Sequence, residues 1–555
     1  MKKVLFSTLA LGLFSLAGFS QTVVNVTDAD LNGGETYNWT KNNIYMLNGF
    51  VFLENAGILN IEAGTVIKGK ETPTSGDNAS ALIITRGAKI NAIGTSTEPV
   101  IFTAEIDDVT NATDLEATDR GLWGGLVILG YGNVAVTADT ANIEGIPTTE
   151  SRAVYGGSND ADNSGTLKYV SIRHGGAELA PGDEINGLTL GGVGSGTTFD
   201  YIEIIANSDD GIEFFGGAAQ VTHLAVSYCG DDAVDYDLGY RGKGQFWFAL
   251  LGSDDADNAG EHDGAKPDGE TPYSNPTIYN ATYIGSGVGA AAKNSTAIHF
   301  RDAAGGTYAN SIFQGFANHA LEVEDLPEAK GVDSRQRMEE GNLNLLNNLF
   351  FDFGAGDKFE VNATNGLLRS TPEAEDSTAQ FLISHLTTNN NSIENPGLTA
   401  ISRSNDGGLD PRPTAGSAAM KAGASIPTGD EFFTEVSYKG AFGDLLWLKG
   451  WTALDEYGHL SAVTGIAQRN NQVALQNYPN PFTGSTVIPF NLKSNDNVTV
   501  KVSDITGKVV AVLLENAPMS AGSHMVNFNN EVSAGTYIYS ITTASGTVSG
   551  LMIAK

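Results

Sequence analysis

Hydrophobic and polar positions alternate in short runs along most of the chain, and turn residues separate one run from the next. The clearest example is residues 201–214, whose pattern returns 22 residues later in residues 223–236. In this register Ile202 corresponds to Leu224, and the apolar positions of the two copies coincide. Because a period of two is typical of strands that bury one face, each copy predicts two or three short β-strands.

A repeat of this length predicts a parallel β-helix in which each copy forms one coil. A second pair of runs, residues 298–300 and 321–323, is related by 23 residues. One coil cannot bury its own inner face, whereas stacked coils bury a continuous apolar column, so Ile212 should lie directly beside Val234 of the next coil. A β-propeller is the alternative, but its blades need about 40 to 50 residues. We therefore predict an all-β main domain built as a parallel β-helix.

The repeat is least clear in residues 322–430. Within them, the charged stretch 328–349 has partial helical spacing at Met338, Leu345 and Leu349, which predicts a loop excursion or a short helix. No long helical pattern is expected before residue 476.

Residues 476–555 form a second region, in which alternation predicts a small antiparallel, immunoglobulin-like β-sandwich of about seven strands. Its motifs together resemble the type A C-terminal sorting domain of the type IX secretion system of Bacteroidetes-group bacteria. The resemblance implies recognition by the type IX translocon of the outer membrane and delivery to the cell surface or the medium. The residues that carry it are Asn477, Pro479, Asn480, Pro481, Phe482, Asp504, Gly507, Gly522, Gly535, Tyr537 and Lys555.

The other end of the chain carries a second export signal. Residues 1–20 combine a basic start at Lys2 and Lys3, an apolar run and small residues before Gln21, which is typical of a secretory signal peptide. The predicted organisation is a signal peptide at 1–20, a β-helix with loop insertions at 21–463, a linker at 464–475 and the sorting domain at 476–555. The expected location is the exterior of the outer membrane.

Charge narrows the classes of partner. The chain has 65 acidic and 31 basic residues and a net charge of −34, so it repels nucleic acid and anionic lipid and attracts cations. No stretch after the signal peptide approaches the roughly 20 apolar residues of a transmembrane helix. Cys229 is the single cysteine, which excludes an intramolecular disulfide and predicts a small core residue.

Several Gly-bounded strand runs carry a further resemblance. They are similar to a large family of exported Bacteroidetes proteins predicted to be right-handed β-helices. The blocks that carry the likeness are residues 57–67, 81–84, 87–95, 99–104, 121–130, 162–170 and 184–197, with closing blocks at 438–443 and 450–452. The likeness covers about residues 40 to 460. It implies a fold and a destination, because the family brings no established catalytic residues.

The repeat places acidic residues in register. Stacking should bring two Asp pairs and an outward Glu–Asp pair onto adjacent coils, with strands about 4.8 Å apart. Like charges so close call for hydrogen bonds, raised pKa values or a bound cation, and Ca²⁺ suits such oxygen-rich sites. The alternative is that the carboxylates accept hydrogen bonds from turn N–H groups. The candidate calcium ligands are Asp209, Asp210, Asp231, Asp232, Glu213 and Asp235.

A catalytic interpretation uses the same turns. Residues 207–209 and 230–232 resemble the acidic motifs of polygalacturonase-type glycoside hydrolases, which are also β-helices and need paired carboxylates. The resemblance makes Asp209, Asp231 and Asp232 candidate catalytic residues. The later Gly-His-Gly and Arg-Ile-Lys motifs of that family have no match here, and the nearest substitutes are residues 262–264 and 299–301.

A weaker metal signal lies in a loop. Asp160, Asp162 and Ser164 followed by Gly165 match the first half of an EF-type calcium loop, but the closing Glu is missing. A related sequence at residues 255–260 has Ala259 at the position where the loop needs an oxygen ligand. A solvated loop is the competing interpretation.

The sequence therefore favours an exported β-helix that acts as a binding or adhesive module, with surface polysaccharide as a candidate partner and calcium as a candidate structural ion. The first alternative is a polysaccharide-degrading enzyme, either a pectinase-like hydrolase or a lyase. The second is a structural spacer on the cell surface.

Overall fold

The computed structural model describes residues 21–555, apart from residues 180–183, 267–268, 291–294, 327–330, 361–367, 372–375, 422, 462–471, 475–476, 478, 493–494, 505–507, 521, 530–531 and 544–545. The predicted signal peptide, Gly507 and most of the predicted linker lie outside the described residues. The chain divides into two compact units, Met1–Ser461 and Ala462–Lys555.

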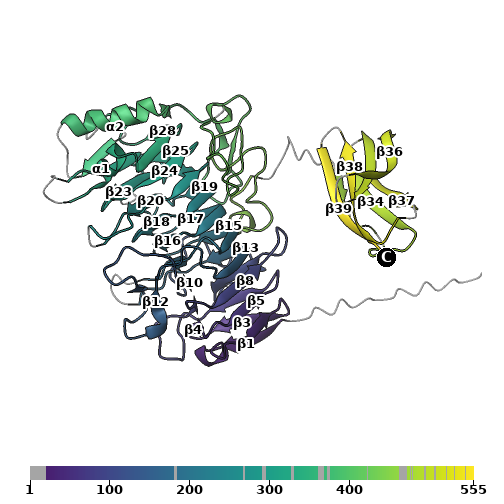
Figure 1. The fold of residues 1–555 in the computed structure, drawn as a ribbon, viewed down its shortest axis with the longest axis horizontal. Helices are drawn as coiled ribbons and strands as arrows, with labels where there is room; N and C mark the ends of the chain where they lie inside the picture. The colour runs from purple at the N-terminus through teal and green to yellow at the C-terminus, as the bar shows by residue number, and fades with distance from the viewer. Residues whose placement is uncertain are drawn as a thin grey trace, which may run out of the picture. The chain divides into compact units, whose positions relative to one another are not determined.

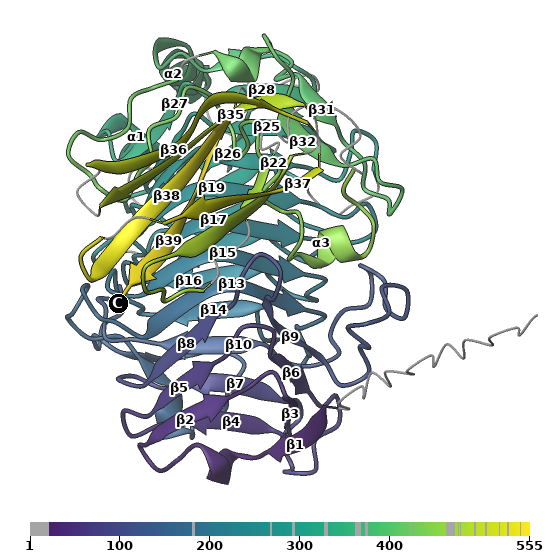
Figure 2. The same cartoon turned by 90° about the vertical axis from the view of Figure 1, so that its right-hand side faces the viewer.

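The first unit is a parallel β-helix, which confirms the predicted fold class. Its coils stack from β1 at one end to β28 and the helix α2 at the other (Figures 1 and 2). One wall, sheet B, contains ten strands among the described residues. These are β4 (Phe50–Leu53), β7 (Ala81–Ile84), β10 (Leu126–Leu129), β14 (Leu188–Gly191), β16 (Ile212–Phe215), β18 (Val234–Asp237), β20 (Gly260–Asp263), β23 (Ile298–Arg301), β26 (Leu321–Glu324) and β29 (Leu368–Thr371).

The remaining walls form sheet A, which has 18 strands in the described part of the chain. These are β1 (Thr22–Val26), β2 (Thr36–Trp39), β3 (Asn43–Leu47), β5 (Ile58–Ile61), β6 (Val66–Gly69), β8 (Lys89–Ile93), β9 (Val100–Ala104), β13 (Gly165–Arg173), β15 (Thr198–Ile205), β17 (Gln220–Ser227), β19 (Lys243–Leu250), β21 (Thr277–Tyr279), β22 (Thr282–Ile284), β24 (Gly306–Ala309), β25 (Ile312–Phe316), β27 (Leu343–Leu346), β28 (Leu349–Phe353) and β30 (Ser392–Ile393).

The strand register agrees with the sequence repeat. Ile202 pairs with Leu224 between β15 and β17, and Ile212 pairs with Val234 between β16 and β18. These side chains point inward and are fully or almost fully buried. Burial of each is worth about 1.5–3 kcal/mol, so the stacked apolar column is the main source of stability in the β-helix.

The long strands of sheet A bend at one repeated position. Tyr169, Tyr201, His223 and Phe246 all have positive φ angles of 49–60°, a backbone conformation that costs non-Gly residues roughly 1–2 kcal/mol each. Their rings stack on one another, with centroids 4.3, 4.1 and 5.0 Å apart. Because each aromatic pair contributes about 0.5–1.5 kcal/mol beyond its burial, stacking offsets much of the backbone cost.

A segment close to the end of the first unit covers the outer side of this bend. Trp451 contacts the ring of Tyr201 edge-on, at 6.1 Å between centroids. The buried Glu203 carboxylate accepts hydrogen bonds from the N–H groups of Ala453, at 2.7 Å, and Leu454, at 3.2 Å, at the start of α3 (Ala453–Glu456). The outward side of sheet A is therefore closed to solvent here, although the alternation alone predicts an exposed face.

The least regular region contains more helix than the sequence pattern suggested. A short helix, α1 (Ser334–Glu339), occurs in the predicted stretch, whereas Leu345 and Leu349 belong to strands β27 and β28. A second helix, α2 (Asp376–Thr388), was not expected. Its Leu382 and Leu386 are buried in the main core, because the last coil needs an apolar cover at the end of the stack.

Two short antiparallel pairs complete the first unit. They are β11 (Ala141–Asn142) with β12 (Val154–Tyr155), and β31 (Leu398–Ala400) with β32 (Asp410–Pro413). Within the described residues, no helix is both long and apolar enough to cross a membrane.

The second unit consists of two antiparallel sheets with seven strands among its described residues, as predicted. Val498, Val500 and Val502 alternate with polar residues and are buried between the sheets. The strands are β33 (Gln472–Ala474), β34 (Thr486–Leu492), β35 (Asp496–Asp504), β36 (Val509–Met519), β37 (Gly522–Phe528), β38 (Gly535–Thr543) and β39 (Gly546–Ala554).

Candidate functional site

The outward positions of sheet B form a column of charged side chains. Glu213, Asp235 and Glu261 follow one another on β16, β18 and β20, and the column continues to His299 on β23 and Glu322 on β26. Their neighbours along each strand point inward, because successive side chains alternate between the two faces. We call this column, together with the adjoining turn residues Asp209, Asp210, Asp231, Asp232 and Asp257, the acidic face.

The turns before these strands form a second ladder. The backbone N–H of Asp232 donates a hydrogen bond of 2.9 Å to Oδ1 of Asp210, one coil earlier. The N–H of Asn258 donates in the same way to the carboxylate of Asp232. Asp210 and Asp232 therefore make the turn hydrogen bonds that we set out as the alternative to metal ligation. This role leaves each carboxylate with further acceptor capacity.

The acidic side chains gather into three linked clusters. Within each cluster one oxygen atom per carboxylate lies within 4.8 Å of the others. Neighbouring clusters share a member, so the carboxylates form a continuous strip across successive coils. The clusters are Asp210–Glu213–Asp235, Asp209–Asp210–Asp231 and Asp231–Asp232–Asp257.

Burial and mutual repulsion alter the acidity of these groups. Burial, followed by the charges of Glu144, Glu184 and Asp231, raises the pKa of Asp209 to about 7. Burial and then neighbouring carboxylates also raise the pKa values of Asp210, Glu213, Asp232 and Asp235 well above their usual range. Both effects disfavour the ionised form, so these carboxyl groups hold their protons to a higher pH than exposed ones do unless a cation compensates their charge.

Several buried oxygen atoms beside the first cluster lack hydrogen bonds. Asn186 donates through Nδ2 to Oε2 of Glu213, at 2.5 Å. Its own Oδ1, the hydroxyl of Thr189 and Oδ1 of Asp235 have no hydrogen-bond partner among the described residues. Because a buried acceptor without a partner costs about 1–3 kcal/mol, these oxygens fit an oxygen-seeking cation better than they fit a dry, empty site. The donor set matches the hard oxygen ligands of Ca²⁺.

The opposite end of the acidic face contains its basic side chains. Arg301 contacts the carboxylates of Glu261, at 2.5 Å, and Asp263, at 2.6 Å. His299 lies 3.5 Å from Glu261 and 3.8 Å from Glu322. Although burial raises the pKa of Glu261, the hydrogen bond from His299 and the charge of Arg301 lower it overall. Basic side chains therefore compensate the negative charge at this end of the acidic face.

The weaker calcium loop is arranged differently. Asp160 contacts Arg241 at 3.0 Å and accepts a hydrogen bond of 2.8 Å from the N–H of Asn133. Asp162 Oδ2 lies 3.4 Å from the hydroxyl of Ser164. Asp160, Asp162 and Ser164 belong to none of the three clusters found among the described residues. Calcium at this loop stays a prediction, with a guanidinium already beside one of its ligands.

Sequence reasoning missed some members of the acidic face. Asp257 belongs to a cluster, and it lies in residues 255–260, which match the EF-type calcium loop incompletely. Glu261 extends the outward column of charged side chains. Residues 260–262 pair with residues 234–236. The longer turn between them breaks the 22-residue period, so the repeat in the sequence does not reveal this pairing. The two substitute motifs, at 262–264 and 299–301, also lie beside each other.

In the sorting domain, the two ends of its sequence meet. The N–H of Phe482 donates to the carbonyl of Ile553, and the N–H of Lys555 donates to the carbonyl of Phe482, both at 2.9 Å. Asn480 Oδ1 accepts from the N–H of Ile553 at 2.8 Å. The first motif and the C-terminal residues thus form one patch.

Other sorting residues stabilise local structure. Asn477 is buried and donates to Thr486 at 2.9 Å, and Tyr537 donates to the carbonyl of Ser533 at 2.9 Å. Asp504 Oδ1, at the end of β35, accepts from the N–H of Lys508 at 3.1 Å.

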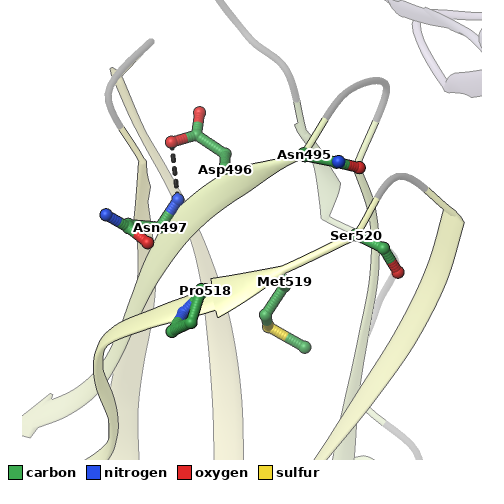
Figure 3. A pocket seen from close by; sticks show the side chains of 6 residues that line it. All are labelled: Asn495, Asp496, Asn497, Pro518, Met519 and Ser520. Atoms are coloured by element: carbon green, nitrogen blue, oxygen red, sulfur yellow. Dashed lines mark hydrogen bonds between the residues drawn. The ribbon is translucent and has the colours of Figure 1, made fainter.

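A shallow hollow lies at the ends of β35 and β36 (Figure 3). Asp496 is the single ionisable side chain among the residues that line it, and its carboxylate accepts a hydrogen bond of 2.7 Å from the adjacent N–H of Asn497. No acid–base or metal-ligand set follows from these residues, so the hollow adds no candidate site.

Comparison with known proteins gives two family matches. A model described as a pectate-lyase-like β-helix domain matches residues 33–395, and one described as a secretion system C-terminal sorting domain matches residues 476–555. No curated protein matches the chain. A solved structure, the enzymatically active domain of bacteriophage CBA120 tailspike protein 4, aligns at 11% identity over 92% of this chain and 64% of that chain. Its TM-score of 0.15 carries no argument.

Proposed function

This chain belongs to the pectate-lyase-like β-helix family and carries a type IX sorting domain, and from that premise we propose that it is a surface-exposed binding module. The sorting domain directs export through the type IX system to the cell surface or the extracellular space. In our proposal the acidic face holds calcium, and the calcium-loaded face binds polysaccharide outside the cell.

The three linked carboxylate clusters carry this proposal. A protein of net charge −34 gains little by adding buried, mutually repelling carboxylates unless a cation compensates them. Asp209, Asp210 and Asp231 supply one oxygen-rich group, and Glu213 and Asp235 extend a second. The orphan oxygens of Asn186 and Thr189 support the same interpretation, since Ca²⁺ takes about six to eight oxygen ligands with loose geometry.

Calcium also gives the face a way to bind sugars. Acidic polysaccharides are repelled by bare carboxylates, whereas a bound divalent cation can share its ligands between protein and sugar. The long outward column offers repeated positions along the stack, which suits a linear polymer. Neutral polysaccharides would depend less on the cation.

Calcium binding is tested by thermal unfolding of the full mature chain with Ca²⁺ and with EDTA. We expect a higher unfolding midpoint with Ca²⁺, because the ion binds the folded state alone. Asp231→Asn should remove most of this difference, whereas Asp444→Asn, at an exposed position outside the acidic face, should retain it. An identical midpoint with Ca²⁺ and EDTA in the unsubstituted protein would contradict the calcium proposal.

Polysaccharide binding is tested on a glycan array in the presence of Ca²⁺. We expect retention of acidic glycans that is lost with EDTA and with Asp231→Asn. A blank array would instead favour the structural spacer, in which the β-helix only sets a distance from the cell surface.

A polysaccharide-degrading enzyme is the second candidate, and the raised pKa of Asp209, to about 7, favours it. A carboxyl group with such a pKa can deliver a proton to a leaving oxygen, while a neighbouring carboxylate such as Asp231 activates water. Assays for reducing ends and for unsaturated products would detect hydrolase and lyase activity separately. Activity that Asp231→Asn abolishes would establish the enzyme; no product from any acidic polysaccharide tested would count against it.

A further inference from the structure

A cavity of about 340 Å³ lies at the corner where chain leaving sheet A turns toward sheet B. Five stretches that are distant in sequence line it: residues 112–113 with 115–118, Tyr228, residues 253–254, residues 403–405, and Tyr457 with His459. None of its lining residues belongs to the acidic face. Its volume lies within the range of about 300–1,000 Å³ that is usual for small-molecule sites.

Ionic and polar anchors hold two of these walls. Arg120 donates to the carbonyl of Tyr228, at 2.6 Å, and pairs with both carboxylate oxygens of Asp254, at 2.9 and 3.3 Å. The loop that contains residues 112–118 is thereby fastened to the corner of the β-helix. Because Arg120 is largely buried, the pair persists better than an exposed ion pair would.

The other walls are anchored as firmly. The hydroxyl of Tyr228 donates to the carbonyl of Arg403, at 2.7 Å, and lies 3.1 Å from Nδ1 of His459. Arg403 in turn donates from Nε to the carbonyl of Gly285, at 2.7 Å. The hydroxyl of Tyr457 lies 2.8 Å from Nε2 of His174. The cavity is therefore formed before any ligand arrives, which lowers the cost of binding.

The charges around the cavity disfavour an anionic ligand. Arg120 is neutralised by Asp254, and the Arg403 guanidinium is directed at backbone carbonyl groups. Burial lowers the pKa of His459, which keeps its imidazole neutral at neutral pH. Arg403 is the one cationic group among the described lining residues, whereas Glu116 and Asp254 are acidic, so the lining has no excess of positive charge to attract a carboxylate or a phosphate.

The uncharged side chains fit a sugar. Leu115 and Ala117 give an apolar side, and the ring of Tyr457 adds an aromatic surface. Ser253, Ser404 and Asn405 contribute hydroxyl and amide groups at exposed positions. A face of aliphatic C–H groups edged by hydroxyl groups is the chemistry of a neutral saccharide.

We propose that this cavity binds one or two residues of a neutral saccharide without calcium. It is a second binding site, separate from the acidic face, and its ligand differs in charge from an acidic polysaccharide. Two such sites on one exported β-helix would let the protein contact a neutral chain end and an acidic polymer together.

The test is titration calorimetry of the full mature chain with cellobiose, maltose and mannobiose, each with Ca²⁺ and with EDTA. We expect saturable binding of at least one disaccharide, equal in the two conditions. Ser253→Trp places a bulky ring among the lining residues and should weaken binding by about tenfold or more, because the ligand loses its volume. Ser158→Trp, at an exposed position outside the cavity, is the matched control and should bind as the unsubstituted chain does.

A second variant keeps the proposal testable if Ser253→Trp fails to fold. Asn405→Ala removes one exposed amide at the cavity and should weaken the same disaccharide by a few fold. Binding that survives both substitutions, or that disappears with EDTA, would place the sugar elsewhere and overturn the proposal. Absence of saturable binding by all three disaccharides at millimolar concentration would also overturn it, while leaving the calcium-dependent acidic face untouched.

Discussion

Replacing Asp237, a buried carboxylate on the same strand as Asp235 of the acidic face, should make the protein more stable at alkaline pH. Asp237 on β18 is 8% exposed. Burial, and then repulsion by Asp263, raises its pKa to about 7. Asp237→Asn removes the charge and retains an oxygen that can accept the hydrogen bond from the N–H of Leu238.

The size and sign of the effect follow from the pKa. A carboxyl group raised from 3.8 to about 7 destabilises the folded, ionised state by roughly 4 kcal/mol relative to the unfolded chain. The folded state binds the proton more tightly than the unfolded state, so the unsubstituted protein keeps its full stability below about pH 4. It loses stability as the pH rises toward 7. The substitution should therefore be nearly neutral at pH 4 and stabilising at pH 8.

Differential scanning calorimetry in EDTA at several pH values measures this prediction. At pH 8 the unfolding midpoint of Asp237→Asn should exceed that of the unsubstituted chain by about 4 °C for a cooperative unit of this length. Asp444→Asn, at an exposed site, should show no such pH-dependent gain. A midpoint for Asp237→Asn that is equal or lower at pH 8, or a gain that is the same at pH 4, would refute the reasoning.

Three further outcomes are expected. Glu203→Ala leaves the start of α3 without its acceptor and should destabilise the β-helix by about 3 kcal/mol, with cleavage by protease near residue 453 as the readout; undiminished resistance would contradict it. Tyr201→Asn keeps a residue that tolerates positive φ but loses two ring stacks, so unfolding should require about 1–2 kcal/mol less. Deletion of residues 553–555 removes the hydrogen bonds with Phe482 and should leave the protein inside the cell envelope, which cell fractionation would detect. Normal export of this variant would show that the patch is not needed for export.

Much of the architecture could be predicted from the sequence because the coils of a β-helix stack at a regular interval of the sequence. When Ile202 and Leu224 occupy equivalent positions of successive copies, their pairing follows from the period alone. The sorting domain could be predicted for a different reason, since several of its characteristic motifs occur within a short segment of the sequence. The helix α2 was missed because the last coil needs an apolar cover, and no repeat signals that requirement.

The candidate site could be predicted only in part from the sequence. Asp209 and Asp231 could be placed together from the 22-residue spacing, whereas Asp257 and Glu261 lie beyond a longer turn that breaks the period. Arg301 contacts Asp263 across 38 positions of sequence, and Arg403 contacts Tyr228 across 175 positions. Such contacts depend on how loops fold over the coils, which local alternation does not encode.

The sequence by itself determined the repeat, the inward apolar column, the negative charge and the sorting domain, because each depends on local composition, local motifs or period. Only the tertiary structure decided which carboxylates are buried together, which of them already hold backbone N–H groups, and where a preformed cavity lies. The physical reason is that burial and electrostatic coupling depend on all atoms within a few ångströms. Those atoms come from segments that only the completed stack brings together.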